Sequence, residues 1–228
     1  MVATSKTSGS PVSAKRRRKN DPESVQADIL AVATREFSEK GLSGARIDEI
    51  AEKTRASKRM IYYYFKDKET LYLHTLEASY KKVRLQEAEL NLDHLAPLEA
   101  LSRLVRFTFC HHAKNPDFIR LVMIENIHHG RFLAQSKLIQ SLNAGVIDVL
   151  TNVYLRGVED GCFRQGLDPR ELHWLISALS FFNVSNQHTF SRIFDWQQTA
   201  PENQQKLEDH VTDMVMRYVR ADETLPSA

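Results

Sequence analysis

The stretch Arg46–Glu69, RIDEIAEKTRASKRMIYYYFKDKE, decides how the rest of the chain is interpreted. It contains two short segments of helical periodicity on either side of a break at Thr54–Ser57. In the first segment, Ile47, Ile50 and Ala51 form an apolar face at positions i, i+3 and i+4. The stretch therefore predicts a short helix, a tight turn and a second short helix.

The second segment combines an apolar side with a polar and aromatic one. Ile61 and Phe65 lie one turn apart, and the hydroxyl of Ser57 can accept from an otherwise unpaired amide as an N-cap. The residues that point elsewhere are Lys58, Arg59, Tyr62 and Tyr64. A helix pair with cations and phenols on its second helix suits reading of the DNA major groove. On this local pattern alone, an αα-hairpin whose tyrosines cover a core stays open as the alternative.

The composition is that of an ordinary soluble protein, with 42% hydrophobic and 26% charged residues in a chain of 228. No apolar run approaches the roughly 18 residues of a membrane span, and the basic N-terminus lacks the hydrophobic region of a secretory signal. Cys110 and Cys162 match no metal or redox spacing. We therefore expect a cytoplasmic protein with no membrane partner.

The net charge of +2 conceals an asymmetry along the chain. Residues 1–66 carry 14 Lys/Arg against 8 Asp/Glu, whereas the remainder carries 17 against 21. Positive charge thus accompanies the helix pair, as binding to a polyanion requires. Residues 1–20 are expected to be disordered, and their run Lys15–Lys19 (KRRRK) could reach a minor groove or screen phosphates. A merely solubilising tail is the alternative.

The remaining periodicity predicts an all-α chain. A first helix begins near Asp21, buries Val25, Ile29, Ala33 and Phe37, and stops at Gly41. Asp67 caps a long helix through about Glu89. Beyond a seam at Asn91–Pro97, helices are expected over about 97–113, 116–128, 131–160, 169–193 and 203–220. No alternating strand pattern competes.

Two apolar stripes near the C-terminus could face the protomer core or a second copy of the chain. The first contains Leu172, Leu175, Leu179 and Phe182, and the second contains Leu207, Val211, Met214 and Tyr218. A four-helix interface between two protomers would use such stripes. A two-fold dimer also suits a helix-turn-helix protein, which reads two-fold related half-sites.

From Ala27 to Leu76 the chain resembles the TetR family of bacterial transcriptional regulators. The motifs are the segment Phe37–Gly41 and the strings IDEIAEKT and SKRMIYYYFKDKETLY. The turn GCFRQGLDP at Gly161–Pro169 is also similar to the family's pattern. The resemblance implies a three-helix helix-turn-helix DNA-binding domain at 21–68, after the arm at 1–20. A larger helical domain for ligand binding and dimerisation would follow at 69–228.

Carried over by position, the family's DNA contacts fall on Arg46, Ser57, Lys58, Arg59, Met60, Tyr62, Tyr64 and Lys68. Lys58 and Arg59 can reach phosphates or guanine edges, whereas apolar Met60 suits a thymine methyl group. The phenols of Tyr62 and Tyr64 can donate to phosphates, contacts that position the protein. To the core of the small domain we assign Ile61, Tyr63 and Phe65.

Two positions depart from the family pattern. Arg46 stands where Thr or Ser usually caps the second helix, and arginine cannot accept from the free amide. Ser43 or Asp48 would then compensate, or Arg46 would contact a phosphate. Arg55 stands at a turn position that glycine commonly holds, so the turn either tolerates a side chain or is strained.

The larger domain offers candidates for a mostly apolar ligand cavity with a few polar groups. They are Phe107, Cys110, His111, Phe118, Met123, Ile127, Asn143 and Asn183, each of which could equally be ordinary core. The adjacent pairs His111–His112 and His128–His129 diverge by about 100° on a helix, and no metal-binding or catalytic motif is present. We therefore expect no metal, no cofactor and no enzyme activity.

These observations favour a homodimeric DNA-binding regulator, a repressor rather than an activator, that responds to a small-molecule effector and binds a palindromic operator. Two rivals remain open. A ligand-free architectural DNA-binding protein would show weak sequence preference and a steep salt dependence. An all-α enzyme with a vestigial DNA-binding domain would show turnover.

Overall fold

The computed structural model describes residues 21–221, so the basic run Lys15–Lys19 lies outside the described residues. Within this range the chain forms ten α-helices and two short 3₁₀ turns, and its one isolated β-bridge joins Phe163 to Arg220. The prediction of an all-α fold is confirmed. None of the described helices combines the length and apolar character that crossing a membrane requires.

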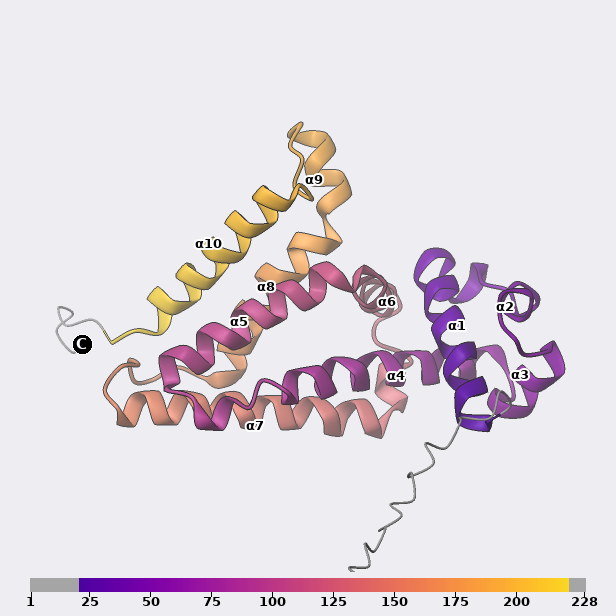
Figure 1. The fold of residues 1–228 in the computed structure, drawn as a ribbon, viewed down its shortest axis with the longest axis horizontal. Coiled ribbons are helices and arrows are strands. Elements are labelled where there is room, and N and C mark those ends of the chain that lie inside the picture. The colour runs from indigo at the N-terminus through magenta and orange to yellow at the C-terminus, as the bar shows by residue number, and fades with distance from the viewer. Residues whose placement is uncertain (1–20, 222–228) are drawn as a thin grey trace, which may run out of the picture.

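Three helices form the part that we call the head: α1 (Pro22–Gly44), α2 (Ile47–Lys53) and α3 (Lys58–Phe65). They lie together at one end of the molecule (Figure 1). Pro22 occupies the first turn of α1, as predicted, although the Asp21 side chain forms no capping hydrogen bond. Gly41 adopts a left-handed φ of 69° and interrupts the helix, as predicted, and one further short turn continues to Gly44.

The core of the head is continuous with the rest of the chain, which we call the body. Its buried apolar residues come from α1–α3 and from the start of α4 (Lys68–Ala88); they include Ile29, Phe37, Ile50, Ile61, Phe65, Leu71, Tyr72 and Leu76. Leu121 of α6 and Phe132 belong to the same cluster. The rings of Tyr72 and Phe132 meet edge to face at 5.1 Å. Helix α6 and the segment after it therefore pack directly against the core of the head.

A buried carboxylate ties α1 to α2. Glu36 is 2% exposed and accepts from the ammonium groups of Lys40, at 2.8 Å, and Lys53. These two hydrogen bonds, that from Lys40 first, lower the pKa of Glu36. Because the carboxylate is both buried and paired, it stabilises the head in its charged form.

The body is built on α4, which leaves the head and runs along α7 (Lys137–Glu159) (Figure 1). Asp67 caps α4 as predicted, with its carboxylate 2.7 Å from the Thr70 N–H. A 3₁₀ turn (Leu92–His94) leads to α5 (Pro97–Lys114), which packs on α7, α8 (Pro169–Ser185) and α10 (Pro201–Val219). The helices α6 (Pro116–Ile127) and α9 (Gln187–Ile193) complete the body.

Two predicted helices have different bounds in the structure. The helix expected over 131–160 begins only at Lys137, because Ser136 caps it by accepting from the Ile139 N–H at 3.1 Å. A 3₁₀ turn (Leu133–Gln135) occupies the preceding segment. The helix expected over 169–193 breaks at Asn186 into α8 and α9.

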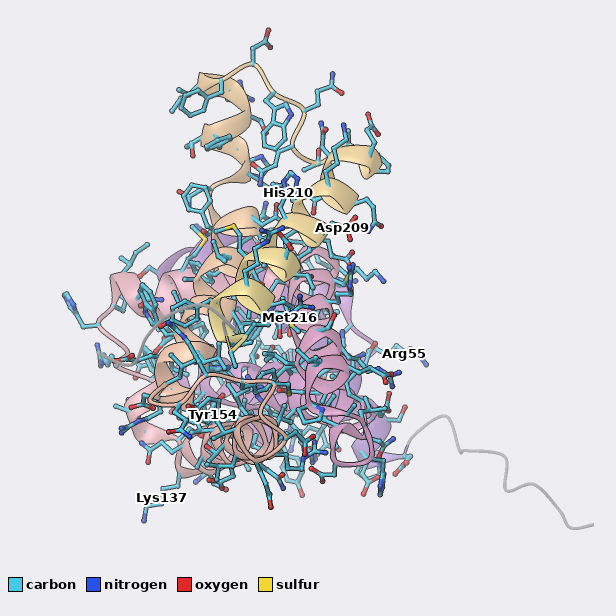
Figure 2. All side chains as sticks on the ribbon, turned by 90° about the vertical axis from the view of Figure 1, so that its left-hand side faces the viewer. Arg55, Lys137, Tyr154, Asp209, His210 and Met216 are labelled. Atoms are coloured by element: carbon cyan, nitrogen blue, oxygen red, sulfur yellow. The ribbon has the colours of Figure 1, made fainter. Side chains whose placement is uncertain are left out.

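The turn between α7 and α8 is held by close packing. A Cβ on Gly157 would lie 2.0 Å from the ring of Phe163, so only glycine fits there. The hydroxyl of Tyr154, labelled in Figure 2, donates to the Arg164 carbonyl and accepts from the Leu167 N–H, both at 3.0 Å. Asp168 then caps α8, as predicted, by accepting from the Arg170 N–H at 2.8 Å.

Candidate DNA-binding surface and ligand cavity

Helix α3 is anchored by two apolar residues and capped at its start. Ile61 and Phe65 are 1% and 3% exposed. The hydroxyl of Ser57 accepts from the Met60 N–H at 3.3 Å, so it caps α3 as predicted. This leaves one side of α3 facing solvent.

The solvent side of α3 contains Lys58, Arg59, Tyr62 and Tyr63. Tyr63 is 81% exposed, so its assignment to the core was wrong. Two residues along a helix correspond to about 200°, so Tyr63 points away from both Ile61 and Phe65. Met60 and Tyr64 are partly buried against the head core and therefore flank the exposed face.

The Lys58 ammonium lies 2.7 Å from the carboxylate of Asp48 on α2. The hydrogen bond to this carboxylate raises the pKa of Lys58. Both side chains are more than half exposed, so the pair is solvated and readily exchanged. Lys58 is thus charged and available at the surface.

Arg46 and Lys68 occupy different positions relative to this face. Arg46 is exposed and precedes α2 with an extended backbone, and none of its side-chain atoms caps the helix. Within the described residues, neither the Ser43 hydroxyl nor the Asp48 carboxylate accepts a hydrogen bond from an α2 amide. Lys68 is half-buried and donates to the Ala45 carbonyl at 3.2 Å, which ties the start of α4 to the turn before α2.

The turn at Arg55 is not strained. Positive φ values at non-glycine residues of the described chain occur at Lys66, Asn91, His129 and Asp195, and not at Arg55. The Arg55 N–H donates instead to the Asp28 carboxylate of α1, at 3.0 Å. Its side chain lies at the edge of the molecule (Figure 2). The turn therefore accommodates an arginine that faces solvent.

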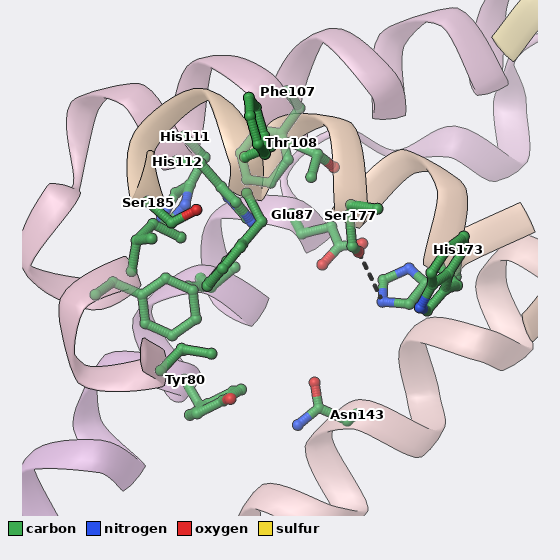
Figure 3. Close-up of a pocket in the computed structure, with 18 of the residues that line it drawn as sticks. Tyr80, Glu87, Phe107, Thr108, His111, His112, Asn143, His173, Ser177 and Ser185 are labelled. Atoms are coloured by element: carbon green, nitrogen blue, oxygen red, sulfur yellow. Dashed lines mark hydrogen bonds between the residues drawn. The ribbon is translucent and has the colours of Figure 1, made fainter. Parts of the chain in front are cut away.

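A cavity of about 520 Å³ lies in the body between α4, α5, α6, α7 and α8. Aromatic residues provide much of its wall, and Phe118 meets Tyr80 edge to face at 5.1 Å. Figure 3 shows His111 and His112 of α5 on one side, with Glu87 of α4 and His173 of α8 opposite them. The volume and the mixed lining fit a small-molecule site.

The titratable groups of this cavity are buried or half-buried. His111 is 5% exposed, and Arg84 is paired with Glu87 on the next turn of α4. Burial, with nearby Lys82 and Arg84, lowers the pKa of His111 to about 4. Burial likewise lowers the pKa of His112 to about 3. Both imidazoles are therefore neutral at pH 7.

The structure brings four of the predicted lining residues to the cavity: Phe107, His111, Phe118 and Asn143. The other four lie elsewhere. The Cys110 thiol faces Glu208 of α10 at 3.2 Å, and Ile127 is 69% exposed at the end of α6. Met123 packs beside the cavity wall without lining it. Asn183 is buried and hydrogen-bonded to Gln198 and Gln204.

Sequence reasoning missed several cavity residues, namely Arg84, Glu87, His112 and His173. The pattern of α4 contained a usable signal. Arg84 and Glu87 lie at i and i+3 on α4, close in sequence to the apolar residues Tyr80 and Val83. A charged pair at this spacing usually marks a solvated helix surface, so the sequence alone does not assign it to a cavity. No described cluster of three or more His, Cys, Asp or Glu side chains could hold a metal ion.

The predicted dimer residues divide by burial. Leu172 and Val211 are 1% and 6% exposed inside the protomer's own core, so they have no surface for a partner. Leu175, Leu179 and Leu207 are partly buried. Those that remain exposed are Phe182, Met214 and Tyr218, on α8 and α10.

Two family models match separate parts of the chain. Residues 29–75, which contain most of the head, match the model for bacterial regulatory proteins of the tetR family. Residues 97–215 match the model of the tetracyclin repressor-like C-terminal domain.

Curated relatives agree with these matches. The HTH-type transcriptional repressor NicS of Pseudomonas putida is 34% identical over 179 residues, 76% of this chain and 84% of NicS. The HTH-type transcriptional regulator RutR of Escherichia coli is 30% identical over 150 residues, 66% of this chain and 69% of RutR.

Solved structures share the fold at lower identity. A bacterial regulatory protein of the tetR family from Rhodococcus RHA1 matches with a TM-score of 0.68 and 21% identity, covering 87% of this chain and 98% of that one. The ketosteroid transcriptional regulator KstR2 of Mycobacterium tuberculosis matches with a TM-score of 0.66 and 18% identity, covering 86% and 95%. The chain therefore belongs to the TetR family of bacterial regulatory proteins and is a DNA-binding transcriptional regulator rather than an enzyme.

Proposed function

We propose that this regulator is a homodimeric repressor that binds a palindromic operator through α2 and α3 and responds to a small molecule in the body cavity. The observation that carries the proposal is the geometry of α3. Ser57 caps the helix, Ile61 and Phe65 anchor it, and Lys58, Arg59 and Tyr62 face solvent. Such a helix can enter a major groove without disturbing the core that holds it.

The exposed residues of α3 supply the proposed DNA contacts. Arg59 suits a guanine edge, Lys58 suits a phosphate, and the Tyr62 hydroxyl can donate to a phosphate oxygen. Arg46, exposed before α2, supplies a further phosphate contact. Tyr63 joins the proposed set because it is more exposed than Tyr62.

The other carried-over residues take lesser roles in the proposal. Met60 and Tyr64 reach DNA only with the exposed edges of their partly buried side chains. Lys68 positions α4 through its bond to the Ala45 carbonyl. Ser57 acts as the cap of α3.

The proposed dimer interface consists of the sides of α8 and α10 that the protomer leaves uncovered. Phe182 is 50% and Met214 56% exposed, and Tyr218 is 39% exposed. Leu175, Leu179 and Leu207 border them. Two protomers joined in this way would place their α3 helices on half-sites about 34 Å apart, one turn of DNA. Replacing Met214 with Glu should shift the protein toward monomer in sedimentation, whereas Lys206→Glu on α10 should not.

Helix α6 provides the proposed connection between cavity and head. Phe118 and Val122 line the cavity, while Leu121 on another side of α6 packs in the head core. A ligand that favours a different position of α6 would change the spacing of the two heads. Couplings of this kind are typically about 1–3 kcal/mol, so operator affinity should fall roughly 5- to 150-fold.

A salt titration on two duplexes tests the proposal. One duplex contains a palindrome that the protein selects from a pool of random duplexes, and the other has the same composition in random order. We expect two protomers per palindrome and a preference of at least about a thousandfold over random sequence. Equal affinities, with only a steep salt slope, would instead support the architectural alternative. An operator affinity that no candidate effector changes would refute the switch.

A further inference from the structure

The cavity contains buried polar atoms that no group in the described chain satisfies. His111 is only 5% exposed, and neither of its ring nitrogens has a hydrogen-bond partner. The Nδ1 of His112 and the Nε of Arg84 are buried and unpartnered as well. An unsatisfied buried polar group costs about 1–3 kcal/mol. The four atoms therefore call for a ligand that carries matching polar atoms.

The chemistry of these atoms indicates an acceptor-rich group. Arg84 Nε–H can only donate, and each imidazole can donate as well. Of the described residues that line the cavity, Glu87 alone is acidic, and Arg84 already engages it. A cationic ligand would meet the Arg84 charge and find no free carboxylate. A ligand carboxylate could accept from Arg84 and from an imidazole at once.

The charges around the cavity indicate that an anion must bind together with a proton. Arg84 and Glu87 cancel, and burial keeps His111 and His112 neutral. The other titratable groups that line this cavity are Tyr80 of α4 and His173 of α8. His111 also borders a second cavity, whose charged residues are Arg35 of α1, Lys82 of α4, Lys114 of α5 and Asp117 of α6. The residues that α6 and α7 contribute to the lining are uncharged: Phe118, Ile119, Val122, Asn126 and Asn143. Among the residues that line the cavity, no net positive charge therefore faces an entering anion until an imidazole takes up a proton.

The rest of the cavity wall favours a ligand whose remaining part is apolar. The rings of Phe107, Phe118 and Phe181 face the same space. A volume of about 520 Å³ exceeds what a single six-membered ring fills, and it lies within the range usual for drug-sized ligands.

We propose that the cavity binds an amphipathic carboxylic acid as its anion, with the carboxylate at Arg84 and His111 and with uptake of one proton by the His111–His112 pair. The inference rests on the proposed function, because it names the ligand class of the same cavity. The bound carboxylate accepts from the Arg84 Nε–H and from one ring N–H of His111, and an apolar group of about two rings lies among the phenylalanines.

The test is calorimetric titration of the full-length protein, without DNA, using three matched probes. The probes are 2-naphthoate, its neutral isostere 2-naphthamide and the cation 2-naphthylmethylammonium. We expect 2-naphthoate to bind at least about tenfold more tightly than the amide. Its affinity should rise by up to about tenfold per pH unit from pH 8 to pH 6, because the anion raises the pKa of the imidazoles. Titrations in two buffers of different ionisation enthalpy should show uptake of one proton.

Two variants assign the effect to the named residues. His111→Gln should reduce both the proton uptake and the pH dependence, and Arg84→Gln with Glu87→Gln should remove the preference for the anion. The double variant removes both charges together, so neither is left buried alone. His128→Gln, an exposed histidine after α6, is the matched control and should bind like the parent. Unchanged melting temperatures show that the variants remain folded.

The inference is overturned if the amide or the ammonium binds as tightly as 2-naphthoate. It is also overturned if benzoate, 2-naphthoate and octanoate all fail to bind at millimolar concentration. The proposed function is tested by a separate result. If 2-naphthoate binds as described but leaves operator affinity unchanged, the ligand class is supported and the ligand-controlled switch is refuted. A neutral ligand that fills the cavity and releases DNA supports the switch and refutes the ligand class.

Discussion

Glu125 joins the cavity helix α6 to the segment that packs on the head. It is 1% exposed, and its Oε2 accepts from the backbone N–H groups of Phe132, at 3.1 Å, and Leu133, at 3.0 Å. Replacement of Glu125 by Ala leaves both amides without this acceptor. At about 1–3 kcal/mol for each unsatisfied buried amide, the free energy of unfolding should fall by about 2–6 kcal/mol.

Glu125→Gln provides a graded comparison. Its amide oxygen can still accept from Phe132 and Leu133, but the acceptor is neutral. Charged acceptors contribute about 1.5–3 kcal/mol and neutral ones about 0.5–1.5, so two bonds should weaken by about 1–3 kcal/mol. The exposed Glu52→Ala on α2 is the control and should change stability by no more than about 0.5 kcal/mol.

Urea unfolding followed by far-ultraviolet circular dichroism measures these differences. We expect Glu125→Ala to destabilise the protein most, Glu125→Gln less and Glu52→Ala least. If the free energy of unfolding of Glu125→Ala lies within about 0.5 kcal/mol of the parent's, the two amides do not depend on Glu125 for stability. Glu125→Ala should also reduce the effect of an effector on operator affinity, because Phe132 belongs to the head core.

Three further substitutions test local features. Ser57→Ala removes the cap of α3 and should lower the free energy of unfolding, measured by thermal unfolding, by about 0.5–2 kcal/mol. A variant as stable as the parent would show that the cap does not stabilise α3. Gly157→Ala drives a methyl group into the ring of Phe163 and should cost at least about 1–3 kcal/mol by urea unfolding; an unchanged midpoint would contradict the packing. Glu36→Gln should cost about 1–3 kcal/mol at neutral pH. Because the bond from Lys40 lowers the pKa of Glu36 in the folded state, this difference should shrink as pH falls below about 4.5; a pH-independent difference would contradict it.

The helix-turn-helix could be predicted because its signals are local. Capping by Ser57 and the spacing of Ile61 and Phe65 suffice to define α3, and both hold in the structure. Tyr63 was misplaced for a physical reason. Tyrosine has an apolar body and a polar tip, so its type does not reveal whether it faces core or solvent, and only helical phase decides.

The cavity could be predicted only in part, because its lining depends on how distant helices are rotated against each other. On α6, Phe118 faces the cavity while Met123 and Ile127 point elsewhere, although all three are apolar. Asn183 finds its partners Gln198 and Gln204 well beyond its own helix. Periodicity identifies the apolar side of one helix but does not say which neighbour covers it.

The same limit applies to the apolar stripes of α8 and α10. Leu172 and Val211 share spacing with Phe182 and Met214, yet the first two are in the protomer core and the others are exposed. Two helices with broad apolar faces can meet the core with one edge and solvent with the other. Packing against α5 decides which edge of each helix faces the core, and the spacing of apolar residues alone does not predict that packing.

The central claim is that α3 reads operator DNA, and fluorescence anisotropy on the palindromic duplex tests it most directly. The measurement compares the parent with Lys58→Ala and Tyr62→Phe across a range of salt concentrations, with exposed Lys206→Ala on α10 as the control. We expect Lys58→Ala to weaken binding and to reduce the salt slope by about 1, as the loss of one phosphate contact would. Tyr62→Phe should weaken binding by about 1 kcal/mol, roughly fivefold, while both variants sediment as dimers. If both bind with the parent's affinity and salt slope, α3 does not contact the operator as described.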